Sequence, residues 1–511
     1  MRYLIWVFTF CLFCGPPRPT ESPEPREAPI PSLEEVQRGL KSTEWSERSQ
    51  AVLAAGHGKY KETIPSLMNL LRSDPNQAVR STCALVLADL GTQEAVPVIA
   101  GMLASNPEGG DALIEALGRL RNPAGAYAVT PFLRSDSNQS RLAAVTALAQ
   151  MKATAAGPQI LAMAQSNASR DVARTYAMAI GQIGVNGADD YLLGLARGGD
   201  DPTTAAAVLA LGHVKSVRAI PFLIEMIGGK YAKGRENSIA ALLEIRHPSS
   251  VNLAFPLLDH ADPEARYGAV DIIAAVPLPD SGPRALKILN ERKPRSTGPA
   301  SLVLGKLKYL AARQNVEAVL TDRSIADREN IAKSLGWMGD SKSTSVLIRV
   351  LEEKDGEGRY GAAWSLGVLR SPEGMKPLMD AANNGDRKLR QIAIEALGSY
   401  GSPDALPALA SMLEDSVLSI YAVDAISAIP GEKARSLLQK HIQKQEGGTR
   451  KAAIAALGRR KEPESIRFLV GILDDDKPEI RSSVMAALSE ITGERFRTRS
   501  GWVDWYEKSG R

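Results

Sequence analysis

Arginines recur along this chain at a spacing that is kept from one end to the other. Successive members of the series lie 31–33 or 60–62 residues apart, which is one or two units of about 31 residues. A period of this length is typical of solenoids, in which each unit buries its apolar face only by stacking on its neighbours. The series comprises Arg48, Arg80, Arg141, Arg174, Arg235, Arg266, Arg328, Arg359, Arg390, Arg450 and Arg481.

Numbering each arginine as position 0 separates the positions of the repeat by chemistry. Skipped registers inferred at Gly110, Thr204, Thr297 and Tyr421 bring the count to fifteen units. Position +7 is Leu, Ile or Ala, position +4 is mostly Val, Ile or Ala, and position +3 is mostly Ala. These positions share one stripe of a helix, so each unit opens with an amphipathic helix. The glycine that is frequent at +8 predicts that the helix ends or bends soon afterwards.

A second apolar segment follows in each unit, as in residues 405–413, and an early proline there suits the first turn of a helix. Acidic turns such as Asp74-Pro75 then lead to the next arginine. Each unit is therefore a helical hairpin, and no alternating apolar and polar run argues for a sheet. We predict an all-α fold, an α-solenoid of about fifteen hairpins that occupies residues 32–491.

The repeat resembles the HEAT-like repeats of the phycobilisome-lyase type, whose units read acidic turn, Val-Arg, small residues, Ala-Leu-Gly and a second helix with proline. Residues 74–91 and 386–398 carry that pattern closely, and the resemblance extends over residues 33–491. It implies the solenoid fold and, as in most members, protein partners. We expect the recurrent arginines to form a ladder of hydrogen bonds to acidic turn residues of adjacent units, the alternative being a binding role.

The amino terminus has the features of an export signal, assigned to residues 1–14. Arg2 precedes an apolar run that is too short to span a bilayer, and Cys14 stands where the run ends. Cys14 resembles the acylated first residue of a bacterial lipoprotein, although Phe13 departs from the small residue usual before it. Cys11 is a second candidate for acylation, and ordinary cleavage or an uncleaved anchor are the alternatives to lipidation.

Residues 15–31 contain seven prolines and predict an extended, semi-rigid linker. Such a linker would hold a folded body away from a membrane. We therefore expect the protein to be lipid-anchored in a bacterial cell envelope.

Charge and cysteine content restrict the classes of partner. The net charge of +4 is small for 511 residues, and charges of both signs are interspersed, so nucleic acid is not predicted. The stretch from Pro283 to Arg313, which includes Arg292 and Arg295, is lopsidedly basic; it is read as a solvated loop or as an anion or acidic-partner site. Cys83 falls in the +3 column and is predicted to be a small buried hydrophobe.

Catalytic families with HEAT-like repeats require side chains that this sequence lacks. None of its five histidines is followed by glutamate, which excludes the di-iron hydroxylase branch. An exported protein is in the wrong compartment for a bilin lyase or a base-excision glycosylase, and no phosphate-binding loop occurs. We expect no catalytic residue, metal or cofactor. The prediction is a non-catalytic scaffold for protein partners of unidentified kind; the alternative is an accessory enzyme or a ligand-binding protein that uses one groove of the array.

Three aromatic residues interrupt columns that are otherwise mostly polar or mixed. Trp337 occupies +9 of one unit, and Tyr360 and Trp364 occupy +1 and +5 of the next. The last two are four residues apart, on one helix face, and Trp337 should lie on the adjacent helix. Exposed aromatic clusters are favoured binding anchors, so we predict that these three residues bind a partner. The alternative is that their rings fold back against neighbouring helices.

Residues 492–511 leave the repeat and are rich in aromatic side chains, among them Trp502, Trp505 and Tyr506. The segment resembles the closing segment of bacterial arrays of this kind. It predicts an aromatic cap over the last unit, since terminal repeats need one, and a separate ligand site is the alternative.

Overall fold

The computed structural model describes residues 31–510 apart from 106–109, 167–168, 199–201, 230–231, 445–447 and 497. Cys11, Cys14 and the linker up to residue 30 thus lie outside the described residues. The described residues form thirty-one α-helices and no β-strand, which confirms the predicted all-α solenoid. No helix in this described part combines the length and the apolarity that a membrane-spanning segment needs.

The chain divides into two compact units, Met1–Asn167 and Ala168–Arg511, and each is described by itself. The first unit contains α1 (Leu33–Gly39), α2 (Trp45–His57), α3 (Ile64–Ser73), α4 (Gln77–Asp89), α5 (Val96–Ser105), α6 (Asp111–Leu120), α7 (Ala126–Val129), α8 (Asn138–Gln150) and α9 (Gly157–Ser166).

The second unit contains α10 (Arg170–Ile183), α11 (Asp189–Ala196), α12 (Pro202–His213), α13 (Ile220–Gly228), α14 (Ala232–Ile245), α15 (Pro248–Ala254), α16 (Pro263–Ala275), α17 (Ser281–Asn290), α18 (Thr297–Lys306), α19 (Arg313–Thr321), α20 (Arg328–Met338), α21 (Thr344–Leu351), α22 (Gly358–Leu369), α23 (Pro372–Asn384), α24 (Arg387–Tyr400), α25 (Leu406–Met412), α26 (Ser419–Ala428), α27 (Glu432–Lys444), α28 (Gly448–Arg460), α29 (Ile466–Gly471), α30 (Pro478–Thr492) and α31 (Arg499–Ser509).

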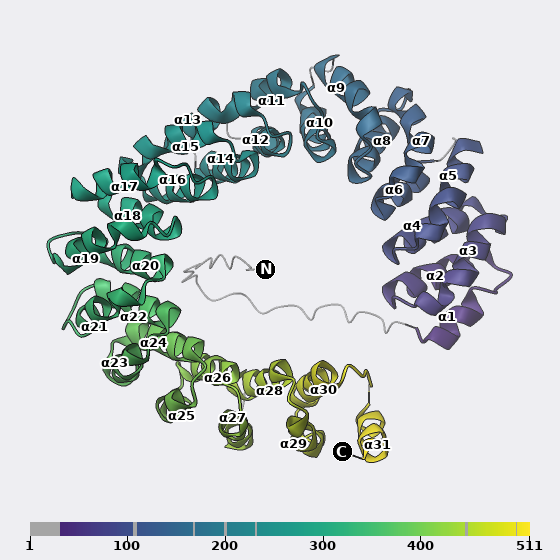
Figure 1. Ribbon diagram of the computed structural model, residues 1–511. Coiled ribbons are helices and arrows are strands. Elements are labelled where there is room, and N and C mark those ends of the chain that lie inside the picture. Colours follow the sequence, from purple (N-terminus) through teal and green to yellow (C-terminus); the bar gives the residue numbers. More distant parts are fainter. Residues whose placement is uncertain are drawn as a thin grey trace, which may run out of the picture. The chain divides into compact units, whose positions relative to one another are not determined.

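Within each unit the helices stack in two layers, as Figure 1 shows. Successive even-numbered helices contact one another, from α2 to α8 in the first unit and from α10 to α30 in the second. The odd-numbered helices form the other layer, and most pack against the even-numbered helix that follows. The even-numbered layer carries the arginine repeat. Positions +1, +5 and +9 therefore lie on the solvent-exposed side of each even-numbered helix.

The core follows the predicted columns with one correction of register. The +7 side chains from Leu87 to Leu488 are almost entirely buried, but Ala428 is exposed. The buried residues of α26 include Ala422, Val423 and Ile426, which stand at +3, +4 and +7 when the register begins at Ser419 and not at Tyr421. Tyr421 lies a full period of 31 residues after Arg390, whereas the register of α26 begins 29 residues after it.

The frequent glycine at +8 serves close packing between helices. Gly398 lies inside α24, and a Cβ atom built on it would come 2.7 Å from Cα of Ala425 in α26. The even-numbered helices end later, near position +11, at a residue with left-handed backbone. This residue is a glycine in some units, as at Gly401 with φ of 65°, and a basic residue in others, as at Lys152 with φ of 52°. The helix therefore ends at +11, three residues after the +8 glycine, in line with the prediction that it ends soon afterwards.

The repeated arginines clamp the turns between helices, as the ladder prediction required. Arg48 binds the Asp74 carboxylate through two bonds of 2.7 and 3.0 Å, while Arg80 of the next helix binds the Asp74 main-chain carbonyl at 2.6 Å. In the second unit Arg450 and Arg481 hold Asp475 in the same two ways. One acidic turn is therefore held from both sides by arginines of successive units, which ties each hairpin to the next.

The segment after α30 packs its aromatic side chains together. Trp502 of α31 is fully buried, its Nε1 donates to the carbonyl of Phe496 at 3.1 Å, and its ring meets that of Phe496 edge to face. The Trp505 ring also meets the Trp502 ring edge to face, with centroids 5.8 Å apart. Helix α31 contacts α29, so the segment lies against the last hairpin of the second unit.

Candidate partner-binding face

The structure brings the predicted aromatic residues to adjacent helices, with different exposure. Trp337 on α20 is 44% exposed, whereas Tyr360 and Trp364 on α22 are half-buried. The rings of Trp337 and Trp364 are in contact, with centroids 5.5 Å apart and planes tilted by 45°. Tyr360 lies one helical turn before Trp364 on α22. We call the solvent-exposed side of α18, α20, α22 and α24 around these three residues the tryptophan face.

Trp364 is half-buried because the neighbouring helix has no side chain beneath it. A Cβ atom on Gly336 of α20 would lie 2.9 Å from Cζ3 of Trp364, so the indole rests on bare backbone. The aromatic residues therefore combine both predictions made from the sequence: Trp364 folds back in part against α20, and Trp337 projects to solvent.

Lysines frame the aromatic rings of this face. Nζ of Lys306, at the end of α18, lies 5.9 Å from the Trp337 centroid and 2.5 Å from Asp271 of α16. Nζ of Lys388, in the first turn of α24, lies 4.1 Å from the Tyr360 centroid. Both placements allow cation–π attraction, which fixes the rings in place. The columns of the repeat do not single out Lys388, which stands at position −2.

A half-buried carboxylate binds two lysines on this face. Glu329 of α20 accepts from Lys333 at 2.6 Å and from Lys388 at 3.0 Å. Burial raises the pKa of Glu329, but the hydrogen bonds from the two lysines outweigh it and the pKa is lowered overall. Glu329 is therefore ionised at neutral pH, and it joins α20 to α24 across the intervening α22.

Tyr360 is also held by hydrogen bonding. Its hydroxyl donates to Asp386, the N-cap residue of α24, at 3.3 Å. Burial, together with the Asp386 carboxylate, raises the pKa of the Tyr360 phenol, so the phenol stays protonated and remains a donor.

A second polar cluster lies beside the face and joins α16 to the start of α20, across the intervening α18. The Tyr267 hydroxyl of α16 donates to Asp327 at 2.8 Å, and Asn330 donates to both, at 3.0 Å to Tyr267 and at 2.7 Å to Asp327. The contact between Tyr267 and Asp327 requires glycine at position 298 of α18, because an added Cβ there would collide with the Asp327 carboxylate. Burial raises the pKa of Asp327. The cluster fixes α16, α18 and α20 relative to one another at the edge of the tryptophan face.

The basic stretch from Pro283 to Arg313 is largely neutralised. Arg292 pairs with Asp322 at 2.9 Å, Lys293 with Glu291 at 2.8 Å, and Arg313 with Glu317 at 2.6 Å. Arg284 stacks on the Phe255 ring, 3.8 Å from its centroid. The stretch comprises α17, α18 and their connections, so it is mostly helical and not a solvated loop.

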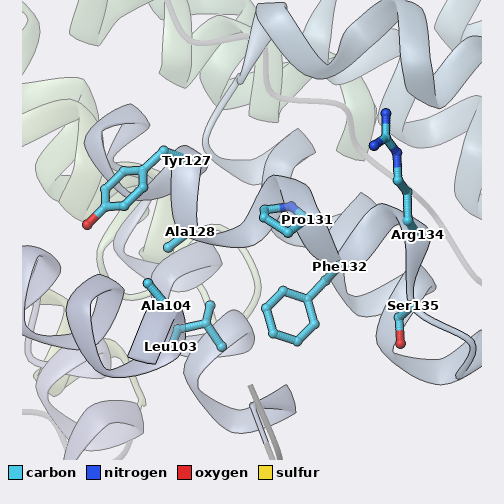
Figure 2. A pocket seen from close by; sticks show the side chains of 8 residues that line it. All are labelled: Leu103, Ala104, Tyr127, Ala128, Pro131, Phe132, Arg134 and Ser135. Carbon is cyan, nitrogen blue, oxygen red and sulfur yellow. The ribbon is translucent and has the colours of Figure 1, made fainter. Parts of the chain in front are cut away.

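The first unit has an apolar pocket between α5 and the α7 region, with a volume of about 370 Å³. Its lining residues are Leu103, Ala104, Tyr127, Ala128, Pro131, Phe132, Arg134 and Ser135. Figure 2 shows the Arg134 side chain extending away from the Phe132 ring. The lining has no carboxylate, histidine or thiol, so the pocket is suited to an apolar group and has no acid–base pair of its own.

Two further observations bear on chemistry in the described residues. No group of three or more His, Cys, Asp or Glu side chains in that part of the chain is arranged to hold a metal ion. Cys83 is fully buried, as predicted, and burial raises the pKa of its thiol to about 12.

Comparison with known proteins agrees with the repeat. A family model described as HEAT repeats matches residues 33–118, 157–236, 344–420 and 414–489, which is more than half of the chain. The alpha subunit of phycocyanobilin lyase from Synechococcus elongatus is 30% identical over 128 residues, covering 23% of this chain and 45% of that protein. The corresponding subunit from Synechocystis sp. is 28% identical over 173 residues, covering 29% of this chain and 63% of that protein. The chain thus spans less than two thirds of these relatives.

Among solved structures, the CpcE–CpcF complex of phycocyanin lyase from Nostoc sp. matches with 20% identity and a TM-score of 0.32, over 46% of this chain and 97% of that chain. The karyopherin Kap121p bound to Pho4p matches with 11% identity and a TM-score of 0.48, over 93% of this chain and 66% of that chain. The extent of the family match and the stacked helical hairpins agree, and the chain belongs to the HEAT-repeat family.

Proposed function

We propose that this HEAT-repeat protein is a non-catalytic scaffold that binds a protein partner on the tryptophan face and is held at a bacterial cell envelope through Cys14. The observation that carries the binding proposal is the contact between Trp337 and Trp364 on the outward side of adjacent helices. An exposed tryptophan supported by a second ring offers a large apolar area at little cost in side-chain entropy. Such residues supply most of the binding energy in protein interfaces.

The charged groups around the rings favour binding over catalysis. Lys306 is paired with Asp271, and Lys333 and Lys388 share Glu329. The Tyr360 phenol has a raised pKa. A general base or nucleophile requires a group with a pKa near the working pH and a free position toward a substrate. The ionised groups here are committed to holding the rings, which is what a preorganised binding surface requires.

The relatives support a protein as the partner. They are named as alpha subunits of phycocyanobilin lyases, and we propose that this chain likewise acts together with another polypeptide. From these relatives we take only the expectation of a partner protein. We do not propose that this chain catalyses the lyase reaction. Cys14, at the end of the apolar run and ahead of seven prolines, is the proposed point of attachment to the membrane.

The test is quantitative capture from a native envelope extract with four forms of the protein. The wild type is compared with Trp337→Ala, Trp364→Ala and a matched control, Trp45→Ala, which removes a 49% exposed tryptophan from α2. We expect at least one protein to be lost from both tryptophan-face variants and retained by Trp45→Ala. Identical capture by all four forms, with melting temperatures unchanged, would contradict the proposal.

The pocket of the first unit supports a second candidate, a binding site for a small apolar ligand. Its volume of about 370 Å³ falls in the range of ligand sites, and its walls are mostly apolar. Replacing Ala128, which is buried in its wall, by Trp should abolish any ligand-induced rise in melting temperature. Trp337→Ala should leave such a rise unchanged, which separates the two candidates.

A further inference from the structure

One of the repeated arginines does not take part in the ladder of hydrogen bonds. The other ten each donate to a main-chain carbonyl six or eight residues earlier in the chain. Arg174 on α10 is exposed and makes no hydrogen bond or ion pair within the part of the chain that the structure describes. Tyr176, Ala177 and Ile180 are buried, so they stand at +3, +4 and +7 of a register that begins at Ala173. Arg174 therefore occupies +1, a solvent-facing position.

Arg174 lines a groove of about 270 Å³ between α10 and α12, which we call the Arg174 groove. Gln182 and His213 line it at position +9 of the two helices, and Met178 and Leu209 line it at +5. These two apolar side chains are 45% and 37% exposed. The remaining lining residues are Pro202, Ala205, Ala206 and Ala210. The groove is thus apolar along its length, with an unpaired cation at one end.

His213, at the other end, is positioned by a helix on either side. Its Nδ1 lies 2.7 Å from Oε2 of Glu244 on α14, and because a carboxylate accepts, we assign the ring proton to Nδ1. A Cβ atom built on Gly181 of α10 would lie 3.4 Å from Cδ2 of His213, so the ring stands over helix backbone. The second ring nitrogen, Nε2, has no partner among the described residues and can accept a hydrogen bond from a ligand.

The length and volume of the groove fit a short extended chain. Gly181 follows Arg174 by seven residues on α10, so the imidazole above it lies about 10 Å from Arg174 along the helix axis. An extended peptide advances about 3.3 Å per residue, so three residues span that distance. The volume is below the range of about 300–1,000 Å³ of small-molecule sites. A peptide also offers a main-chain N–H and C=O at every residue, which suits His213 and Gln182.

We propose that the Arg174 groove binds the free carboxyl terminus of a protein whose last residues are apolar and extended. The terminal carboxylate binds the Arg174 guanidinium, whose fork of donors matches two carboxylate oxygens. The apolar side chains pack on Met178 and Leu209, and a main-chain N–H of the peptide donates to Nε2 of His213. The site goes beyond the proposed function, because it lies on α10 and α12 and uses no residue of the tryptophan face.

Fluorescence anisotropy with two peptides and the full chain tests the requirement for a carboxylate. One peptide is Gly-Ser-Ala-Leu-Val-Leu with a free carboxyl terminus, the other is the same sequence with a terminal carboxamide, and both are labelled at the amino end. We expect the free acid to bind at least about tenfold more tightly than the amide, because only the acid forms a charged hydrogen bond. Arg174→Gln should bind both peptides equally weakly. The control Arg349→Gln removes an exposed arginine from α21 and should keep the full preference.

His213→Phe tests the other end of the groove, because it keeps a flat ring and removes Nε2. It should weaken binding of both peptides at least about threefold and leave their ratio unchanged. All three variants should melt at the wild-type temperature, because the replaced side chains are exposed.

Four results overturn the inference: equal affinity of the acid and the amide for the wild type, a preference that survives Arg174→Gln, indifference to His213→Phe, or no binding of either peptide. Competition with decanoate separates the two sources of a carboxylate. Tighter binding of decanoate than of the free-acid peptide assigns the groove to a small carboxylic acid and also overturns the inference.

Discussion

Arg328 and Glu353 show how a single position of the repeat holds the array together. Arg328 is 7% exposed, and its two terminal nitrogens bind the two carboxylate oxygens of Glu353 at 2.7 and 2.6 Å. Its Nε donates to the carbonyl of Leu320 at 2.9 Å. All three nitrogens of the Arg328 guanidinium therefore donate a hydrogen bond within the structure. A single residue thus connects the start of α20 to the turn beyond α21.

Replacing Arg328 by alanine should destabilise the second unit strongly. The Glu353 side chain is 17% exposed and would lose its bidentate partner. Breaking a buried ion pair in this way costs about 3–5 kcal/mol. The control is Arg459→Ala, because the Arg459 side chain is 50% exposed and pairs with an Asp424 that is 63% exposed; such a pair contributes about 0–1 kcal/mol. Urea unfolding measures both, and equal midpoints for the two variants would refute the role assigned to Arg328.

The same ion pair predicts a dependence of stability on pH. Hydrogen bonding from Arg328 lowers the pKa of Glu353 below its ordinary value of 4.5. The unfolded chain thus binds a proton at a higher pH than the folded chain, and the stabilisation is complete above pH 4.5 and lost as pH falls through the folded pKa. Melting temperatures between pH 6 and pH 3 should fall less steeply for Arg328→Ala than for the wild type. Parallel curves would show that the pair makes no such contribution.

At the scale of single helices, close packing in the stack depends on glycines at a few helix–helix contacts. An alanine Cβ at position 398 would lie 2.7 Å from Cα of Ala425, which forces α24 and α26 apart. Gly398→Ala should therefore destabilise the protein by about 1–3 kcal/mol. Gly194 lies inside α11 with no neighbour within 4 Å of a built Cβ, so Gly194→Ala should stabilise it by about 0.5–1 kcal/mol. Thermal melting distinguishes the signs, and stabilisation by Gly398→Ala would contradict the close packing.

The sequence predicts the helices better than it predicts their ends and registers. Columns +3, +4 and +7 place the core because apolar periodicity reports burial directly. The left-handed residue at +11 gives no such signal, since lysine and arginine, as at Lys152 and Arg370, have no preference for that conformation. The register of α26 had no arginine to mark it, so Ser419 could be found only from the packing.

The tryptophan face was predictable in its residues and not in its geometry. Trp337, Tyr360 and Trp364 stand out because they occupy columns that are otherwise mostly polar. The seat of Trp364 on Gly336, the reach of Lys388 to Tyr360 and the link from Tyr267 to Asp327 all cross from one repeat to another. Contacts of this kind depend on how far each helix is rotated in the stack, which a single sequence does not specify.

At the scale of the whole molecule, the envelope proposal depends on one covalent modification. The apolar run before Cys14 and the prolines after it predict that the mature chain starts at an acylated Cys14. Intact mass of the protein purified from its native membrane should equal that of residues 14–511 plus the acyl groups, and Cys14→Ser should release the chain from the membrane fraction. A mature chain that starts beyond Cys14, or one without acyl mass, would remove the basis for the tether.

The proposed scaffold function requires that the tryptophan face be the surface that binds the partner. Isothermal titration of a partner identified by capture, against the wild type, Trp364→Ala and Trp45→Ala, tests it most directly. Loss of a central tryptophan anchor costs about 2 kcal/mol or more, so Kd should rise at least about thirtyfold for Trp364→Ala. It should stay within about twofold for Trp45→Ala, whose tryptophan lies on α2 in the first unit. Equal Kd values for the three proteins would show that the partner binds elsewhere on the array.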